Sequence, residues 1–222
     1  MWKKDRLITP SILNVKPEDR RMVILNLLNF GIKWIHYDMM DGEFVPNTAI
    51  SIEEFINLRK RTDEHIADVH LMVKDPQNWI DPLLAWTDFI TMHIESFANP
   101  DDVLAIFEKY KHTAKFGLSV KPNTNIEILR PYLKYLSLVL IMSVEPGKGG
   151  QEFIDSSLDK VKELRLMMLE EETPKIKIQI DGGINNITVK KAFAAGVDAA
   201  VSGSYLINNL KIETIAEMLK KD

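Results

Sequence analysis

Eight short apolar runs alternate along this chain with longer segments in which apolar residues recur at helical spacing. The apolar runs span Leu7–Leu13, Trp34–Met40, Ile66–Val73, Phe89–Ile94, Lys115–Val120, Leu138–Val144, Ile176–Asp181 and Val197–Ser202. The helical segments span Pro17–Phe30, Ile52–Arg61, Gln77–Trp86, Asp101–Tyr110, Asn125–Tyr135, Ser156–Glu171, Thr188–Ala195 and Ile212–Lys221. Because each crossover between neighbouring parallel strands needs a helix-sized connection, this alternation predicts a parallel sheet.

The number of strand–helix units favours a closed barrel, since the chain has 222 residues and such barrels typically take roughly 250. The alternative is an open, doubly wound sheet, whose first strand usually leads into a glycine-rich turn. Here the first run is followed by Asn14-Val15-Lys16-Pro17, which contains no glycine. No linker, low-complexity tract or strong internal repeat divides the sequence. We therefore predict a single-domain (β/α)₈ TIM barrel that spans residues 1–222.

Charge and cysteine content narrow the range of functions. The formal net charge of −4 is a weak acidic bias, which argues against a nucleic-acid or membrane-surface role. Residues 1–8 lack the apolar core of a signal peptide, and no stretch approaches the roughly 18 apolar residues of a membrane span. We therefore expect a cytoplasmic protein. The chain contains no cysteine, so any metal ion must be held by His, Asp or Glu.

Polar residues occur in three of the runs where a core strand should be apolar. Alternate residues share one face of a strand, so His36 and Asp38 point the same way in the second run. His70 in the third run and Asp181 in the seventh lie near the strand ends at which barrel active sites form. Each could be a separately satisfied polar residue, but burying all of them unpaired costs several kcal/mol. We expect them to bind one divalent metal ion, and Zn, Fe(II), Mn and Co suit such ligands about equally well.

Glycines gather after the last three predicted strands. They lie in Gly147-Lys148-Gly149-Gly150, in Asp181-Gly182-Gly183 and in Gly203-Ser204. Any one of these groups could be an ordinary turn. Glycine also lets backbone N–H groups approach a ligand closely, and the loops after strands seven and eight of many barrels bind phosphate. Three such loops in succession therefore favour a phosphorylated ligand.

Several motifs in this order resemble the ribulose-phosphate 3-epimerase family, along nearly the whole length of the chain. The matching segments are Pro10-Ser11-Ile12-Leu13, Asp38-Met39-Met40-Asp41-Gly42, Phe44-Val45-Pro46-Asn47, His70-Leu71-Met72-Val73, Met142-Ser143-Val144-Glu145-Pro146-Gly147, Gly149-Gly150-Gln151, Asp181-Gly182-Gly183-Ile184 and Ser202-Gly203-Ser204. The segments from Asp38 to Asn47 and from Met142 to Gln151 are the most specific in combination.

This resemblance implies an isomerase of the pentose phosphate pathway that interconverts D-ribulose 5-phosphate and D-xylulose 5-phosphate, and a homo-oligomer. It places the metal ligands on His36, Asp38, His70 and Asp181, and the acid/base pair on Asp38 and Asp181. It places the substrate contacts on Ser11, His70, Gly147, Lys148, Gly149, Gly150, Gly182, Gly183, Gly203 and Ser204. Epimerisation beside a ketone removes a proton from one face of a carbon and returns it to the other through an enediolate, so two carboxylates are needed.

The sequence departs from the family pattern at three positions. Lys148 stands where the family commonly has Phe, Glu43 where His is common and Asn123 where Gly is common. Lys148 either contacts the phosphate or points to solvent. None of these positions is an expected metal ligand or acid/base residue, so the departures bear on substrate preference and not on the class of reaction.

Three other functions remain possible on sequence grounds. A 3-epimerase of a hexulose 6-phosphate, such as allulose 6-phosphate, would use the same motifs. A phosphate-barrel lyase, such as a hexulose-phosphate synthase or a relative of orotidine-phosphate decarboxylase, typically relies on a different arrangement of acidic residues and lysine. A non-catalytic protein that binds a sugar phosphate or a metal would be expected to have lost an acid/base residue, and both Asp38 and Asp181 are present.

Overall fold

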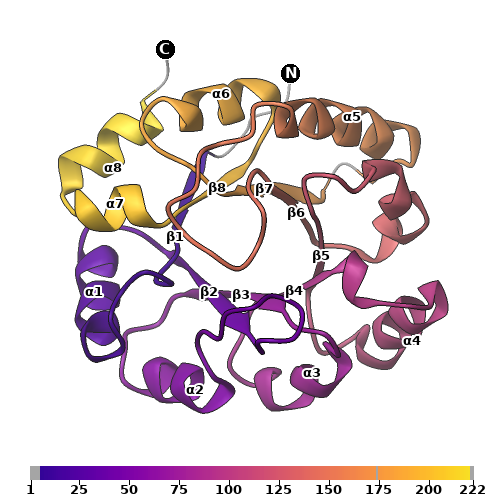
Figure 1. Ribbon diagram of the computed structural model, residues 1–222, viewed down its shortest axis with the longest axis horizontal. Helices are drawn as coiled ribbons and strands as arrows, with labels where there is room; N and C mark the ends of the chain where they lie inside the picture. Colours follow the sequence, from indigo (N-terminus) through magenta and orange to yellow (C-terminus); the bar gives the residue numbers. More distant parts are fainter. Residues whose placement is uncertain (1–5, 174, 221–222) are drawn as a thin grey trace.

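The computed structural model describes residues 6–173 and 175–220. Within these residues eight parallel strands form one sheet, in the order β1-β8-β7-β6-β5-β4-β3-β2, and the helices surround it (Figure 1). The strands are β1 (Leu7–Pro10), β2 (Trp34–Met40), β3 (Ile66–Met72), β4 (Phe89–His93), β5 (Phe116–Val120), β6 (Leu138–Met142), β7 (Lys177–Asp181) and β8 (Ala199–Ser202). The predicted (β/α)₈ TIM barrel is confirmed.

The ring closes between the first and second strands. β1 pairs with β8 from Leu7 to Pro10, and β8 ends at Ser202, the partner of Pro10. β1 therefore ends three residues before the predicted Leu13. Just beyond it, Ser11 forms a parallel bridge with His36 of β2. This closure brings Ser11 to the strand that carries two of the expected metal ligands.

The helices follow the strands in the predicted order, with two differences. They are α1 (Pro17–Asn29), α2 (Ile52–Lys60), α3 (Gln77–Leu83), α4 (Pro100–Tyr110), α5 (Ser157–Glu170), α6 (Thr188–Ala195), α7 (Ser204–Asn208) and α8 (Ile212–Leu219), together with the 3₁₀ segments η1 (Ile94–Ser96) and η2 (Ile126–Tyr135). The segment predicted as an α-helix over Asn125–Tyr135 is 3₁₀, and it contains Pro131, which lacks an N–H to donate. The short α7 was not predicted. The predicted end of the last helix, Lys221, lies outside the described residues.

Side chains at the helix ends explain several boundaries. Asn99 accepts a hydrogen bond from the backbone N–H of Asp101 and Pro100 opens α4, as its sequence predicts. Gly196, with φ of 121°, ends α6. Asp75-Pro76 is a similar pair in the sequence, but α3 begins after Pro76 without a side-chain cap. None of the helices in the described part of the chain is long and apolar enough to cross a membrane.

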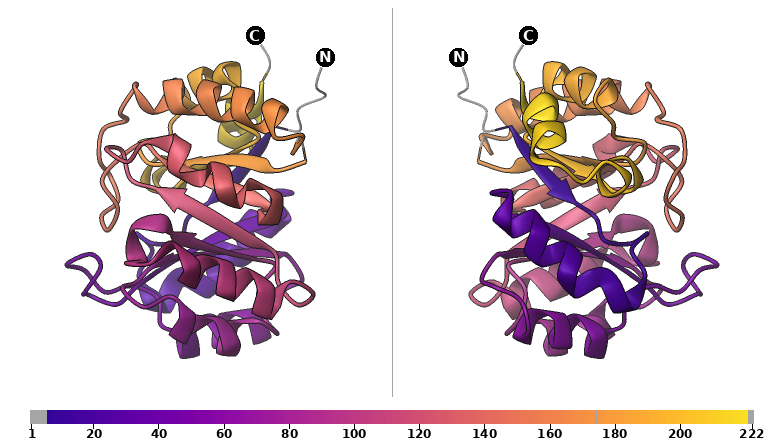
Figure 2. Two further views of the ribbon diagram at one scale, coloured as in Figure 1. Left: turned by 90° about the vertical axis from the view of Figure 1, so that its right-hand side faces the viewer. Right: turned by 90° about the vertical axis from the view of Figure 1, so that its left-hand side faces the viewer.

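The strands separate two packing layers. Tyr37 of β2 faces outward, where its ring meets the edge of Phe55 on α2 at a centroid distance of 4.9 Å. Its neighbours His36 and Asp38 face the inside of the barrel, because side chains alternate along a strand. At one end of the barrel the loops after β2 and β6 extend outward together (Figure 2). The candidate site lies at this end.

Candidate active site

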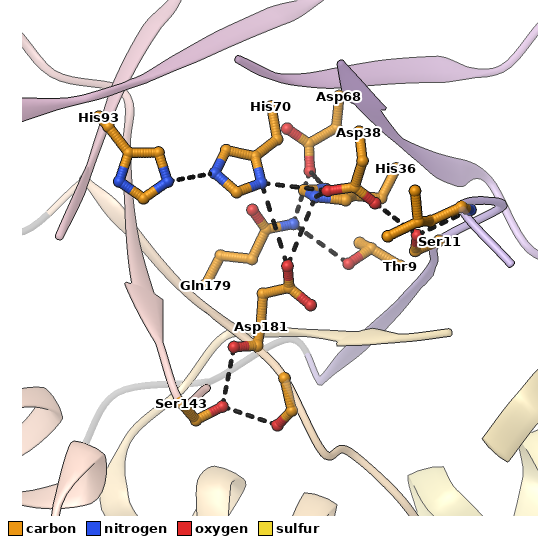
Figure 3. Close-up of polar contacts among 12 residues, drawn as sticks. Thr9, Ser11, His36, Asp38, Asp68, His70, His93, Ser143, Gln179 and Asp181 are labelled. Atoms are coloured by element: carbon orange, nitrogen blue, oxygen red, sulfur yellow. Dashed lines mark hydrogen bonds and ion pairs between the residues drawn. The ribbon is translucent and has the colours of Figure 1, made fainter. Parts of the chain in front are cut away.

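Four polar side chains from three strands converge at the end of the barrel. The β2–β3 register pairs Asp38 with His70, and Asp181 ends β7. The ligand atoms of His36, Asp38, His70 and Asp181 all lie within 4.8 Å of one another (Figure 3). The structure thus brings together all four residues that the sequence marked as metal ligands.

His36 is held by a carboxylate on the side away from the cluster. Its side chain is fully buried, and its Nδ1 lies 2.9 Å from Oδ2 of Asp68, which also accepts a hydrogen bond of 2.6 Å from Gln179. Because an ionised carboxylate only accepts, Nδ1 carries a proton. The opposite nitrogen, Nε2, has no hydrogen-bond partner, and it lies 3.4 Å from Asp38 Oδ1 and 4.0 Å from Asp181 Oδ2.

Asp38 is fixed from both sides. Its Oδ2 accepts a hydrogen bond of 2.6 Å from the hydroxyl of Ser11, and its Oδ1 lies 3.2 Å from Nδ1 of His70. The other nitrogen of His70, Nε2, contacts Nε2 of His93 at 2.9 Å. Ser11 was expected to contact the substrate, and here its hydroxyl orients one of the two expected acid/base residues.

The two carboxyl groups have opposite electrostatic surroundings. Burial acts to raise the pKa of Asp38, but the imidazoles of His36 and His70 outweigh it and hold that pKa below its ordinary value. Burial raises the pKa of Asp181 to about 7, and the negative charge of Asp38 adds to the rise. Burial would lower the pKa of His36, yet Asp38 and Asp68 together raise it well above its ordinary value. The cluster therefore attracts positive charge.

The donor set fits a divalent cation. Two imidazole nitrogens and two carboxylate oxygens face one point, and the buried Nε2 of His36 lacks any other partner. In the absence of an ion, a proton on His36 offsets part of the carboxylate charge. A divalent ion would offset more of it and give Nε2 a partner, and this mixed set of nitrogen and oxygen ligands suits Zn, Fe(II), Mn or Co.

A cavity of about 210 Å³ opens above the cluster. Of the expected site residues, those that line it are Ser11, Asp38, Gly147, Lys148, Gly149, Gly150, Asp181, Gly182, Gly183, Gly203 and Ser204. His36 and His70 are fully buried and are not among the lining residues. Met40, Met72 and Met142 also line the cavity, and these three side chains give the wall beside the carboxylates an apolar character.

The loop after β7 passes its neighbours too closely for a side chain. Gly182 and Gly183 have φ of 120° and 62°, in the left-handed region that favours glycine. A Cβ on Gly182 would lie 2.5 Å from Val144 Cγ2, and one on Gly183 would lie 2.5 Å from the backbone nitrogen of Phe153. These glycines bring the loop after β7 against the segment that follows β6.

Side-chain amides hold the loop after β6 over the cavity. Gln151 donates to the carbonyl oxygens of Glu145 and Lys148, each at 2.7 Å, and Asn47 donates to that of Gly147 at 2.8 Å. Asn14, which also lines the cavity, donates to the Ser204 hydroxyl at 2.8 Å. The role of Asn14 was missed because it depends on a loop more than a hundred residues away. Among the departures from the family pattern, the exposed Lys148 lines the cavity, whereas Glu43 and Asn123 do not.

Comparisons with known proteins identify the family of this chain. The model of the ribulose-phosphate 3 epimerase family matches residues 7–207. A ribulose-phosphate 3-epimerase of Mycobacterium tuberculosis is 40% identical over 199 residues, which cover 89% of this chain and 84% of the relative. A cytoplasmic isoform from Oryza sativa is 34% identical over 224 residues, which cover 96% of this chain and 92% of the relative. A tryptophan synthase alpha-subunit from Pyrococcus furiosus has a TM-score of 0.70 at 14% identity and covers 99% of both chains, a likeness of fold alone.

Proposed function

This chain belongs to the ribulose-phosphate 3-epimerase family, and we propose that it interconverts D-ribulose 5-phosphate and D-xylulose 5-phosphate by proton transfer between Asp38, Asp181 and the substrate. It is an isomerase that epimerises a pentose phosphate. The finer proposal is carried by one observation. Two carboxyl groups from different strands line one cavity, and their surroundings move their pKa values in opposite directions.

The separation of pKa values supports a division of labour. In the ion-free protein near neutral pH, Asp38 is ionised and ready to accept a proton, whereas Asp181 is partly protonated and ready to donate one. Asp38 removes the proton from C3 on one face of the sugar, and Asp181 delivers a proton to the opposite face of the planar enediolate. In the reverse reaction the two residues exchange roles.

The surrounding residues hold this pair in place. The hydroxyl of Ser11 fixes Oδ2 of Asp38, and the methionines that line the cavity exclude water from the reacting carbon. His36, Asp38, His70 and Asp181 would hold one divalent ion. Such an ion, when bound, supplies positive charge that stabilises the negative oxygens of the enediolate.

We propose that the three glycine loops bind the substrate phosphate mainly through backbone N–H groups. They surround the cavity with Gly147, Gly149, Gly150, Gly182, Gly183, Gly203 and Ser204. Their only cationic side chain is Lys148, which is exposed. A phosphate held at this edge leaves the other end of the sugar at the carboxylates.

A coupled assay with purified full-length protein tests the proposed function. We expect turnover of D-ribulose 5-phosphate to exceed that of allulose 6-phosphate, to stop after chelation and to return with one equivalent of a divalent metal. Elemental analysis should find about one ion per chain, bound through the four clustered residues. Full activity in metal-free protein would contradict the metal site, and a preference for allulose 6-phosphate would assign the enzyme to the hexulose phosphates.

Location and assembly remain predictions. A cytoplasmic location is supported by the rice relative, which is named a cytoplasmic isoform. A homo-oligomer is expected from the family resemblance, and neither a nucleic acid nor a membrane is expected as a partner. Size-exclusion chromatography with light scattering would test the assembly.

A further inference from the structure

Gly149 differs from the other glycines of the loop after β6. Gly147 and Gly150 have φ of 103° and 75°, in the left-handed region that favours glycine, whereas φ of Gly149 lies outside that region. The reason for a glycine at this position is space. A Cβ on Gly149 would lie 2.3 Å from Nδ2 and 2.6 Å from Oδ1 of Asn14. The amide group of Asn14 thus occupies the place that a side chain of residue 149 would take.

The same amide group contacts the loop after β8. Nδ2 of Asn14 donates a hydrogen bond of 2.8 Å to Oγ of Ser204. Asn14 itself follows β1, so this one side chain joins the loops after β1, β6 and β8, which meet at the mouth of the barrel (Figure 1). Asn14, Gly149 and Ser204 all line the cavity.

The bond from Asn14 determines what the hydroxyl of Ser204 can do. A hydroxyl group has one proton to donate and two lone pairs that accept, whereas an amide NH₂ group only donates. Ser204 therefore accepts from Asn14 and keeps its own proton for a different partner. A phosphate oxygen in the cavity would be such a partner.

We propose that Asn14 is a positioning residue for the substrate phosphate, which packs against Gly149 and directs the hydroxyl proton of Ser204 toward the anion. The inference rests on the proposed function in one respect, which is that a phosphate binds at these loops. An amide suits this position. A carboxylate of the same shape would take the proton of Ser204 for itself and would bring a negative charge close to the phosphate.

The variant Asn14→Leu removes the hydrogen bond and keeps a branched side chain beside Gly149. The hydroxyl of Ser204 can then turn away from the phosphate, so KM for D-ribulose 5-phosphate should rise about 3- to 10-fold. The value of kcat should stay within about twofold, because the phosphate is bound equally in the ground state and the transition state. In a Ser204→Ala background, Asn14→Leu should have almost no further effect, because the hydroxyl through which it acts is absent.

A second pair of variants approaches Asn14 from the opposite side. Gly149→Ala places a Cβ where the amide of Asn14 lies, without a strained φ, so it should displace that amide and weaken phosphate binding. In the double variant Gly149→Ala/Asn14→Ala the amide is gone and the Cβ has room. We therefore expect the double variant to bind phosphate as well as Asn14→Ala alone. A role of Gly149 that does not involve Asn14 predicts that the two losses add.

Both pairs are measured on full-length protein with two readouts. Steady-state kinetics with D-ribulose 5-phosphate give KM and kcat. Titration with inorganic phosphate, followed by the backbone amide signals of Gly149 and Ser204, gives the phosphate affinity without turnover. Asn26→Leu, at an exposed position of α1, is the matched control and should leave both readouts unchanged.

Three results would overturn the proposal. The first is an Asn14→Leu variant whose KM and phosphate affinity stay within about twofold of the wild type. The second is a fall in kcat larger than the rise in KM, and the third is additive losses in either pair. Wild-type protein that binds phosphate without epimerising D-ribulose 5-phosphate would overturn the proposed function alone, because the phosphate affinities still decide the role of Asn14.

Discussion

The floor and the rim of the cavity are built in opposite ways. The floor is made of side-chain atoms: His36, His70 and Asp38 are buried, and each has a defined partner within the barrel. The rim is made largely of backbone, in three loops whose glycines leave no room for side chains at Gly182 and Gly183. The structure of the floor therefore depends on particular side-chain atoms, whereas the structure of the rim depends on positions that carry no side chain.

This difference predicts opposite responses to mutation. On the floor, exchanging one oxygen for nitrogen should be costly, because a buried group cannot find another partner. On the rim, removing a side chain should matter little and adding a methyl group should matter much. The four predictions that follow test this contrast, from the largest expected effect to the smallest.

The largest effect is expected for Asp38→Asn and Asp181→Asn. Each removes a proton-transfer group without a change of shape, so kcat should fall about 10²- to 10⁴-fold. Exchange of the C3 proton with deuterated solvent separates loss of a base from loss of metal, because a variant that keeps its ion can still exchange one face. Asp155→Asn, an exposed site paired with Lys191, is the matched charge control. Near-normal turnover of either floor variant would contradict the two-aspartate mechanism.

The second effect concerns pH and the ion-free protein. The raised pKa of Asp181, about 7, means that the folded protein holds a proton that the unfolded chain releases near pH 4. This proton stabilises the fold at low pH, and its contribution is lost as pH rises through about 7. The contribution of Asp181 to the free energy of unfolding should therefore fall by up to roughly 3 kcal/mol between pH 5 and pH 8.

Urea unfolding of metal-free protein at the two pH values measures this change. Asn resembles the protonated carboxyl group, so Asp181→Asn should lack the contribution of Asp181 to the pH dependence and should be more stable than the wild type at pH 8. The variant would be inactive yet more stable than the wild type, because it no longer buries the ionised carboxylate of Asp181. A rim variant such as Gly183→Ala should retain the pH dependence. A stability difference between Asp181→Asn and the wild type that does not grow from pH 5 to pH 8 would contradict the raised pKa of Asp181.

The third prediction compares two glycines of the rim. An alanine at Gly183 would place its Cβ 2.5 Å from the backbone of Phe153 at φ of 62°, so Gly183→Ala should cost about 1–2 kcal/mol of stability. At Gly203 the nearest atom to a Cβ is that of Ser11, at 3.7 Å, and the fold can accept it. Both variants should raise KM about 10- to 100-fold, since each disturbs hydrogen bonds to a charged phosphate. Thermal unfolding together with KM separates the two, and an unchanged KM in Gly203→Ala would remove that residue from the phosphate site.

The sequence was sufficient for the parts of the molecule that repeat a simple pattern. β2 has its predicted bounds because every residue from Trp34 to Met40 is buried, and polar residues in so apolar a strand mark the metal site. The α-helix expected over Asn125–Tyr135 is instead the 3₁₀ segment η2, and Pro131 within it lacks an N–H to donate. Helical spacing of apolar residues does not distinguish these two helix types over a short segment.

The hydrogen bonds beneath the floor of the cavity were not predicted, although the sequence contained an indication of them. Thr9, Asp68 and Gln179 each lie two residues before a site residue, on the same strand face, and they are joined by hydrogen bonds through the amide of Gln179. A second polar residue on the face of an apolar strand is thus a sign of a second layer. The contact of His93 with Glu95 carried a weaker signal, because it depends on how the loops after β4 and β5 meet.

The smallest effect is expected at Lys148, the position where this chain departs from its family on the rim. The side chain is exposed, and exposed charge pairs contribute about 0.2–1 kcal/mol, so Lys148→Ala should raise KM by at most about fivefold. Lys162→Ala on α5 removes the same charge from an exposed pair with Asp159 and should leave KM unchanged. Measuring KM at low and high salt sharpens the result, because only a contact between Lys148 and the phosphate would be screened. If Lys148→Ala raises KM more than Gly203→Ala does, the rim binds phosphate by a side-chain charge, and the contrast between floor and rim fails at the rim.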